Sequence, residues 1–375
     1  MSVDLHPGWG SLIKWLASQG MDTSPTGLLV EPRRSNGAGY GLYALSSISP
    51  STLLFSVPAS ALLNKRTLAP HYPSADSLTA IQVISLHLFL HRPIDDVNGS
   101  SDPLFGPYIS ILPREFDDHP LTWLVKDQMT CSEAKEKQLL SYIPRSVMYC
   151  LVEMVDKFKT DWTICSRYLR HNSANLAHVF KLRSEDCRED APPLDYLWAW
   201  LNVNTRCIFH RLKERRSDPD NMTLCPILDF ANHSSRHPSM TPYASEADIW
   251  DKPSSKRYGC DFGLSSPFEH SVDEGEEVFL RYGMHSSRTL FTEYGFVESG
   301  SELDGGPSGE VDLTIFMSEL FSAKGDRGHW MKERLVEEGY WGQVFVSVAD
   351  LSYSDELETG PYTIYQHQPI PHTGS

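Results

Sequence analysis

Hydrophobic and polar positions follow different periods in different parts of the chain, and each period predicts a kind of element. The run "SLIKWLASQG" places Leu12, Trp15 and Leu16 at helical spacing before Gly20, which predicts a short opening helix. Between residues 27 and 58, short apolar or alternating runs are separated by glycine, serine and proline, as in small β-strands joined by turns. This part of the chain therefore predicts one helix followed by a β-rich unit.

The apolar pattern becomes helical from residue 75. Leu78, Ile81 and Leu88 follow a spacing of about 3.6 residues. Similar patterns recur through "CSEAKEKQLLSYIPRSVMYCLVEMVDKFK" and "LDYLWAWLNVNTRCIFHRL". Strand-like runs return with "LCPILDF", "YGCDFGL" and "EEVFLRYG". Residues 75–190 are therefore predicted to form a helical insertion between two β-rich parts.

The last part of the pattern is again helical. "SSRTLFTEYG" offers a serine N-cap and a glycine stop for one short helix. Beyond the glycine- and serine-rich linker "SGSELDGGPSGE", an amphipathic stretch covers residues 313–339 and precedes a polar tail. A second, smaller helical segment is therefore expected after the β-rich part.

Composition narrows the class of partner and the compartment. The chain has 375 residues, enough for a large core, and its 33 basic and 49 acidic residues give a net charge of −16. That charge disfavours nonspecific binding to nucleic acid or anionic membranes and suits a basic partner. Seven cysteines without a C-x-x-C pair predict neither a disulfide framework nor a cysteine-rich zinc cluster. Without a signal peptide or an apolar run of membrane-spanning length, the protein is expected in the nucleus, the cytoplasm or both.

The stretch "LCPILDFANHSS" is the first candidate for chemistry. An apolar run ends in Asp229 and is followed by the adjacent pair Asn232 and His233, which need hydrogen-bond partners once water is excluded. A metal site of Asp229, His233 and His237 is conceivable, but a structural role is the preferred interpretation of these residue types alone. No G-x-S-x-G elbow marks a hydrolase nucleophile.

Two further stretches are ambiguous when each is taken alone. The loop "SNGAGYGLYA" lets backbone groups approach a ligand closely, although a turn at a strand entry is the simpler interpretation. A dinucleotide fingerprint that starts at Gly37 is excluded because Leu42 stands where glycine is required. Tyr282 and Tyr294 each precede a glycine, and tyrosines at such junctions are usually residues at the core edge.

The same stretches taken together, in order, resemble a known family. "GAGYGLYA", a long helical insertion, "VNTRCIF", "LCPILDFANH", "DEGEEVFLRYG" and "LFTEYGFV" resemble the SET-domain protein methyltransferases, specifically the subgroup of the Rubisco large-subunit methyltransferase. The resemblance covers about residues 27–298 and, more weakly, the segment after 310. It implies an α+β fold: a β-rich SET fold with a pseudoknot-like threaded segment, a large helical insertion and a short C-terminal helical segment.

The resemblance also assigns the segments of the chain. They are an N-terminal helix (1–26), the N-terminal part of the SET domain (27–74), the helical insertion (75–190), the C-terminal part of the SET domain (191–298), a linker (299–312) and a truncated region similar to the subgroup's substrate-binding domain (313–375).

By the same resemblance, one pocket binds S-adenosyl-L-methionine. The main chain of the glycine loop lies against the methionine part of the cofactor, an arginine meets its carboxylate, and the Asn-His pair binds its adenine end while its side chains tie the threaded segments together. The matching cofactor-binding positions are Ala38, Gly39, Tyr40, Arg206, Asn232 and His233.

The resemblance makes Tyr282 the catalytic tyrosine that orients the incoming amine. Tyr294 matches a second tyrosine of the transfer channel, and Tyr243 is a candidate for substrate binding in the same wall. The implied activity is S-adenosylmethionine-dependent N-methylation of a lysine on a non-histone protein or a histone. No metal is expected, because the cysteine-rich post-SET element is missing.

Two other functions remain open. Relatives with this architecture include a protein-histidine methyltransferase, and the residues that choose lysine over imidazole are not evident in this sequence. A non-catalytic adaptor that keeps the fold but binds partners through the insertion is the alternative from another class. In each case the expected partner is a protein, for the enzyme one that presents a lysine, with no direct nucleic-acid or membrane contact.

Overall fold

The β-strands are short and pair in small antiparallel sheets. The computed structural model describes residues 4–35, 39–93, 99–129, 133–174, 176, 192–243, 258–283, 285–298, 310–312, 314–337, 341 and 345–347. Within these ranges the sheets are β1 (Val30–Ser35) with β2 (Gly39–Ala44); β3 (Leu53–Val57) with β8 (Phe262–Ser265) and β7 (Thr241–Pro242); β4 (Leu63–Asn64) with β6 (Met222–Leu224) and β5 (Ile208–Phe209); and β9 (Glu310–Asp312) with β10 (Phe345–Ser347).

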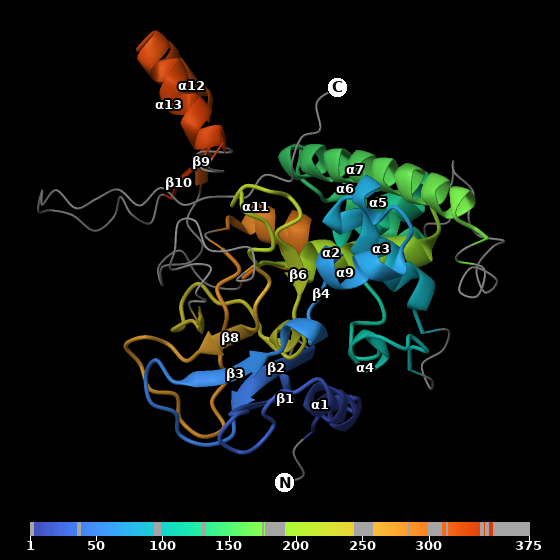
Figure 1. Cartoon of the computed structure of the whole chain (residues 1–375). Helices are drawn as coiled ribbons and strands as arrows, with labels where there is room; N and C mark the ends of the chain where they lie inside the picture. The colour runs from blue at the N-terminus through green and yellow to red at the C-terminus, as the bar shows by residue number, and fades with distance from the viewer. Residues whose placement is uncertain are drawn as a thin grey trace, which may run out of the picture.

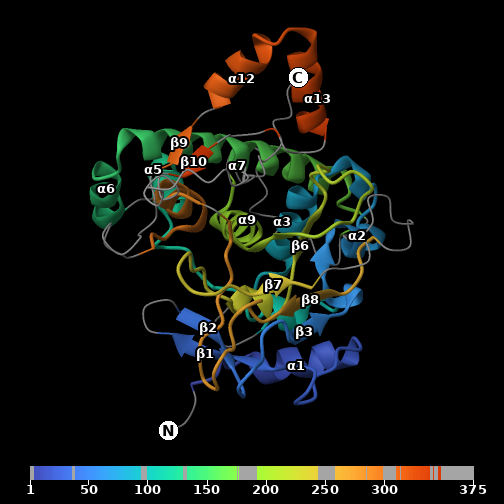
Figure 2. The same ribbon diagram turned by 90° about the vertical axis from the view of Figure 1, so that its left-hand side faces the viewer.

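Most helices lie together on one side of these strands. The helices of this lobe are α2 (Lys65–Leu68), α3 (Ala80–His91), α5 (Pro120–Gln128), α6 (Ala134–Ser141), α7 (Arg145–His171) and α9 (Leu194–Arg206), whereas the short helix α4 (Gly106–Ile109) contacts both α1 and α3. Figures 1 and 2 show α3, α7 and α9 above the strands β1, β2, β3 and β8, with α1 (Trp9–Ser18) on the opposite side. The predicted opening helix and the helical pattern after residue 75 are therefore present.

Helix α3 is more deeply buried than its pattern predicts. The sequence indicates one apolar face, but ten of its twelve residues are buried. It packs between α9 and α7, and its cap is a complete capping box, in which Thr79 accepts from the Gln82 amide and Gln82 accepts from the Thr79 amide. A helix that is apolar on all sides suits such a central position.

Two of the predicted strands are irregular. In "LCPILDF" only Leu224 belongs to a strand, because Pro226 cannot donate to a ladder and Ile227 has φ +72°, after which Leu228–Phe230 forms a single 3₁₀ turn. The run "EEVFLRYG" forms isolated bridges rather than a continuous strand. The first departure leads into the Asn-His pair, and the second contacts that pair through the bridge between His233 and Leu280.

The predicted helix in "SSRTLFTEYG" begins and ends as expected. The Ser286 hydroxyl accepts from the Thr289 amide, and Gly295 ends the helix with φ +82°. Its first turn is α11 (Ser287–Thr289), and residues Leu290–Tyr294 form a π-helical turn. Such turns are rare and frequently occur at functional sites.

The amphipathic stretch after residue 313 forms α12 (Thr314–Ser322) and α13 (Asp326–Glu337), which pack on each other. The Glu337 carbonyl accepts hydrogen bonds from Arg215 Nε at 3.1 Å and Ser217 Oγ at 2.7 Å. The outer part of the pair stands away from the rest of the chain (Figures 1 and 2). Among the helices that the structure describes, none is long and apolar enough to cross a membrane.

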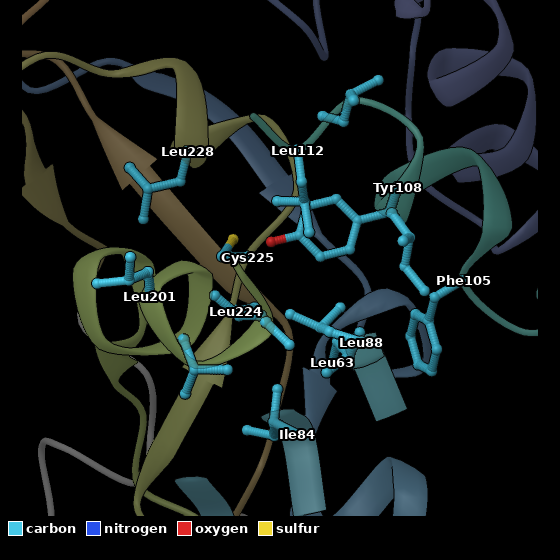
Figure 3. Close-up of a cluster of buried hydrophobic side chains, with 14 of the residues drawn as sticks. Leu63, Ile84, Leu88, Phe105, Tyr108, Leu112, Leu201, Leu224, Cys225 and Leu228 are labelled. Carbon is cyan, nitrogen blue, oxygen red and sulfur yellow. The ribbon is translucent and has the colours of Figure 1, made fainter. Parts of the chain in front are cut away.

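A buried cluster joins the helical lobe to the segment before the Asn-His pair (Figure 3). Tyr108 projects from α4 into this cluster, and its hydroxyl end points toward Cys225. The labelled members come from α3, α4, α9 and the surrounding loops and strands: Leu63, Ile84, Leu88, Phe105, Tyr108, Leu112, Leu201, Leu224, Cys225 and Leu228. Packing of these side chains fixes the insertion against the segment that leads to the candidate site.

Candidate functional site

Residues 276–282 run between β2 and the segment that begins at Asn232. On one side, Val278 N donates to Leu42 O at 2.8 Å, and on the other, Leu280 N donates to Asn232 O at 2.9 Å. Main-chain hydrogen bonds thus hold three segments that are far apart in sequence side by side. We call this arrangement of three segments the crossing. Residues 276–282 are the threaded segment that the resemblance implies.

The Asn232 side chain ties the crossing together. Its Nδ2 donates to Glu277 Oε1 at 2.6 Å, and the other carboxylate oxygen of Glu277 accepts from the Tyr43 hydroxyl at 3.2 Å. A Cβ on Gly41 would lie 2.1 Å from Glu277 Oε1 and 3.0 Å from Asn232 Nδ2. Glycine at this position of β2 is therefore what allows the amide and the carboxylate to meet.

Sequence reasoning missed Glu277. It stands in the acidic run "DEGEE", where a solvated position is the ordinary interpretation. The signal available in the sequence was its position directly before the apolar residues "VFL", which places it at the edge of a buried segment. Its partner Asn232 is 45 residues away in sequence, and the pairing depends on the register of the crossing.

The His233 ring ties the same segments from the other side. Tyr282 N donates to His233 Nδ1 at 3.1 Å, and the imidazole Nε2 lies 3.9 Å from Glu298 Oε2. Burial lowers the pKa of His233, which keeps Nδ1 available as an acceptor. Both members of the Asn-His pair therefore use their side chains to hold the crossing.

Tyr282 and Tyr294 form an aromatic wall with Phe296. The ring centroids of the two tyrosines are 5.2 Å apart, and each lies 6.3 Å from the Phe296 centroid. The Tyr282 hydroxyl donates to the Ala231 carbonyl at 2.7 Å. Burial raises the pKa of Tyr282 to about 12 and that of Tyr294 still further, so both hydroxyls remain protonated at neutral pH.

Arg206, at the C-terminal end of α9, reaches the same region. Its Nη1 donates to the Asp229 carbonyl at 2.8 Å, while its buried Nε has no hydrogen-bond partner among the residues that the structure describes. The Tyr108 hydroxyl donates to the Asp229 carboxylate. Burial raises the pKa of Asp229 to about 6, and the positive charge of Arg206 opposes that rise.

Gly39, at the start of β2, borders open space. Gly39 has φ +76°, and apart from its two chain neighbours no described residue has an atom within 4 Å of the position where its Cβ would stand. The neighbouring Tyr40 ring lies 4.8 Å from His6 and 6.3 Å from Phe230, centroid to centroid. Ala38, the third residue predicted from this loop, lies outside the described residues.

These groups border one cleft with a volume of about 2980 Å³. The predicted site residues that line it come from both β-rich parts and from α9: Gly39, Tyr40, Arg206, Asn232, His233, Tyr282 and Tyr294. Residues that sequence reasoning did not select also line it, namely His6, Phe230, His285, Phe296 and Glu298. Phe296 follows Tyr294 in the quoted "TEYGFV" run, so its apolar ring was the available signal.

Two candidates are not part of this arrangement. Tyr243 was predicted for the substrate wall, but its side chain is 61% exposed, its amide donates to the Gly263 carbonyl at 2.8 Å in the β7–β8 sheet, and it does not line the cleft. Within the described ranges, Asp229, His233 and His237 do not gather as metal ligands; His237 Nδ1 instead lies 2.9 Å from Ser234 Oγ.

Comparison with known proteins gives relatives over most of the chain, although no family model matches it. It is 26% identical over 344 residues to the ribosomal lysine N-methyltransferase set11 of Schizosaccharomyces pombe, covering 92% of this chain and 72% of that protein. It is 26% identical over 308 residues to human SET domain-containing protein 4, covering 76% of this chain and 57% of that one.

Among solved structures, that of the Rubisco LSMT bound to sinefungin and monomethyllysine matches 86% of this chain and 64% of its own, with 19% identity and a TM-score of 0.53. Along most of its length the chain is thus similar to SET-domain lysine methyltransferases and shares their SET fold, and the resemblance that its motifs carry is confirmed.

Proposed function

We propose that this chain is an S-adenosylmethionine-dependent protein-lysine N-methyltransferase. The observation that carries the proposal is the convergence of Gly39, Arg206, Asn232 and Tyr282 on one cleft, although they come from segments far apart in sequence. A relative named as a ribosomal lysine N-methyltransferase and a similar fold solved with monomethyllysine support the acceptor.

The residues present fit the cofactor. The open space beside Gly39 gives a ligand access to main-chain groups of β2, and the unpartnered Arg206 Nε suits a carboxylate, which accepts charge-assisted hydrogen bonds from guanidinium groups. When bound, the cofactor supplies a methyl group already activated by its sulfonium. We infer that Arg206, Gly39, Tyr40 and the main chain of Asn232 and His233 hold it.

The aromatic wall would align the acceptor. Methyl transfer to an amine needs a neutral nitrogen lone pair held in line with the bond that breaks, so positioning contributes more than acid–base strength. Tyr282, Tyr294 and Phe296 limit the directions from which a side chain can approach. Because the pKa of Tyr282 is raised to about 12, its hydroxyl orients groups by hydrogen bonding and does not act as a base at neutral pH.

The charge of the chain bears on the substrate. A net charge of −16 favours encounter with a basic, lysine-bearing protein, and the name of the first relative makes ribosomal proteins the first pool to test. We further propose that the enzyme acts in the nucleus, the cytoplasm or both. Four of the described cysteines, at positions 150, 165, 207 and 225, are free thiols, as reducing compartments maintain.

The cofactor assignment is tested by calorimetry. The purified chain should bind S-adenosylmethionine and S-adenosylhomocysteine saturably, and Arg206→Met should weaken both. Arg236→Met is a matched control at the cleft margin, outside the predicted cofactor positions. Equal affinity of wild type and Arg206→Met, with both folded, would contradict the assignment.

The acceptor is tested by mass spectrometry. A lysate from cells that lack the protein is incubated with methyl-labelled cofactor and either wild type or Tyr282→Phe, and labelled residues are located in peptides. Label on lysine in the wild-type sample alone supports the proposal. Label on histidine would instead support a protein-histidine methyltransferase. Cofactor binding without label in any protein pool would support a non-catalytic adaptor.

A further inference from the structure

A second cluster of metal-ligating side chains lies in the helical lobe, apart from the crossing. His87 and His91 are one helical turn apart on α3, so both rings project from the same face, with centroids 4.6 Å apart. Asp102, in the loop before α4, approaches both rings. Within the described part of the chain, these three residues are the histidine, cysteine or carboxylate side chains that lie close enough together to share one ion.

The distances suit a single small cation. Asp102 Oδ2 lies 3.1 Å from His87 Nε2, Asp102 Oδ1 lies 3.7 Å from His91 Nε2, and the candidate ligand atoms all lie within 4.8 Å of one another. Zinc binds histidine nitrogen and carboxylate oxygen at about 2.0–2.2 Å in tetrahedral geometry, which separates two ligand atoms by about 3.4 Å. A small contraction of the cluster would therefore give three bonds of ordinary length.

A network of hydrogen bonds alone leaves this cluster incomplete. If the Tyr72 hydroxyl donates to His87 Nδ1, at 2.8 Å, then His87 Nε2 can donate to Asp102 Oδ2. That arrangement leaves Asp102 Oδ1 without a hydrogen bond from any described residue, although the side chain is only 1% exposed. A buried carboxylate oxygen without a partner is unfavourable, and a cation between it and the two rings would satisfy it.

The surroundings orient the three ligands. With Nε2 on a metal, His87 Nδ1 carries the proton and donates to the Tyr72 oxygen, the outer contact typical of metal-bound histidine. The Phe105 amide donates to Asp102 Oδ2 at 2.7 Å, and Ser100 Oγ donates to the His91 carbonyl at 2.7 Å. Loop and helix are thus held in place around the cluster by bonds that do not occupy Asp102 Oδ1.

We propose that His87, His91 and Asp102 bind one zinc ion that fastens the loop before α4 to α3. Ser100 and Asp102 are among the residues that line the large cleft. Three protein ligands leave the fourth position of a tetrahedral zinc ion for water. The sequence predicts no metal because the cysteine-rich post-SET element is missing, and that prediction concerns a different place in the fold. The spacing of the two histidines in "HLFLH" was the signal in the sequence for this separate site. The site does not depend on the proposed methyltransferase activity.

Metal binding to the full-length chain tests the proposal. After dialysis against chelator, titration with zinc chloride should show one saturable site, and His91→Gln or Asp102→Asn should weaken it at least about tenfold, the scale seen when even an outer partner of a metal ligand is removed. His171→Gln, an exposed histidine at the end of α7, is the matched control and should bind as wild type does. No saturable binding by wild type, or equal binding by the variants, overturns the site.

Two further readouts keep the test decisive if a variant is poorly folded. Zinc should raise the melting temperature of wild type and of His171→Gln, since a ligand that binds only the folded state stabilises it. Titration of wild type with cobalt(II) should give the visible absorption of a tetrahedral site with nitrogen and oxygen ligands. An absorption spectrum of hydrated cobalt, or an unchanged melting temperature with zinc, contradicts the proposal without any variant.

Discussion

The centre of the helical lobe is fully buried and the crossing only partly, and different forces hold them. In the lobe, α3, α7 and α9 meet through large rings: Trp162 is fully buried, with its ring centroid 5.6 Å from Phe89 and 4.8 Å from Tyr196. In the crossing, main-chain hydrogen bonds and the contact between Asn232 and Glu277 hold the segments. Apolar contact is nondirectional, whereas each hydrogen bond fixes one geometry.

The two regions contribute different properties, the lobe stability and the crossing the position of the site residues. Packing in the lobe supplies stability and tolerates changes of similar shape and volume. The crossing supplies position, because a shifted hydrogen bond there moves Tyr282 or the glycine loop directly. We therefore expect substitutions in the lobe to change mainly the free energy of unfolding, and substitutions in the crossing to change binding or catalysis with a smaller loss of stability.

The largest effect is expected in the lobe. Trp162→Ala should lower the free energy of unfolding by about 3–5 kcal/mol, because it leaves a cavity among rings that cannot close around it. Trp330, on α13, is 60% exposed, so Trp330→Ala is the control and should change stability by less than about 0.5 kcal/mol. Urea unfolding followed by fluorescence and circular dichroism measures both. Similar losses of stability for the two variants would show that packing in the lobe does not supply more stability than an exposed side chain does.

The next effect separates catalysis from stability. Tyr282→Phe should reduce kcat by roughly two orders of magnitude, the scale for removal of one well-placed polar group, while cofactor affinity stays nearly unchanged. Tyr294→Phe should reduce the rate less and change the number of methyl groups added. Tyr142→Phe, 73% exposed, is the control. Full activity of Tyr282→Phe on a verified substrate would make Tyr294 the next candidate.

A smaller effect should appear at the contact between Asn232 and Glu277 in the crossing. Asn232→Ala should destabilise the fold by about 1–3 kcal/mol and weaken cofactor binding, because it leaves the Glu277 carboxylate without its shortest hydrogen bond. Glu277→Ala should give a similar loss, and the double variant should lose less than the sum. Glu276→Gln, at the exposed neighbouring position, is the control. Strict additivity of the two losses would show that the contact contributes nothing.

The last effect is a gradual one, a slope in stability with pH. Burial raises the pKa of Asp229 to about 6, above its ordinary value of 3.8, so the folded state binds the proton more tightly than the unfolded state. Stability from this group is complete below about pH 4 and is lost as pH rises through about 6, with a slope of at most about 1.4 kcal/mol per pH unit. Subtracting the unfolding free energies of Asp229→Asn from those of wild type across this range should isolate the slope. A flat difference would contradict the raised pKa.

Local patterns predicted the elements well where local interactions form them. The helix that starts at Ser286 and ends at Gly295 follows from its cap and its glycine, and α1 follows from the spacing of Leu12 and Leu16. The irregular path through Ile227 was not predictable in this way, because a positive φ is rare for a β-branched residue and no glycine or asparagine marks it in the sequence. The SET fold itself was predicted from the order of the motifs rather than from any single one.

The candidate site was predictable only in part, for a related reason. Motifs identified Arg206, Asn232 and Tyr282, which line one cleft as expected. The role predicted for Tyr243 stays a prediction, because a position in the loop after the Asn-His pair does not determine whether a ring faces the cleft; in the structure this residue is 61% exposed. Glu277 was missed because its partner is chosen by the alignment of distant segments.

The position of residues 276–282 between β2 and the Asn-His segment has a consequence for the order of folding. The pairing of Leu42 with Val278 joins residues more than 230 positions apart, and contacts of such long range form slowly, because a long loop must close before they contribute. On the ribosome, β2 is synthesised long before its neighbour emerges, so the first half of the chain must wait with one edge of the future cleft unpaired. The ability to bind a ligand should therefore appear late and abruptly during synthesis, when residues 276–282 have been made. Ligand binding would then report that the crossing has formed.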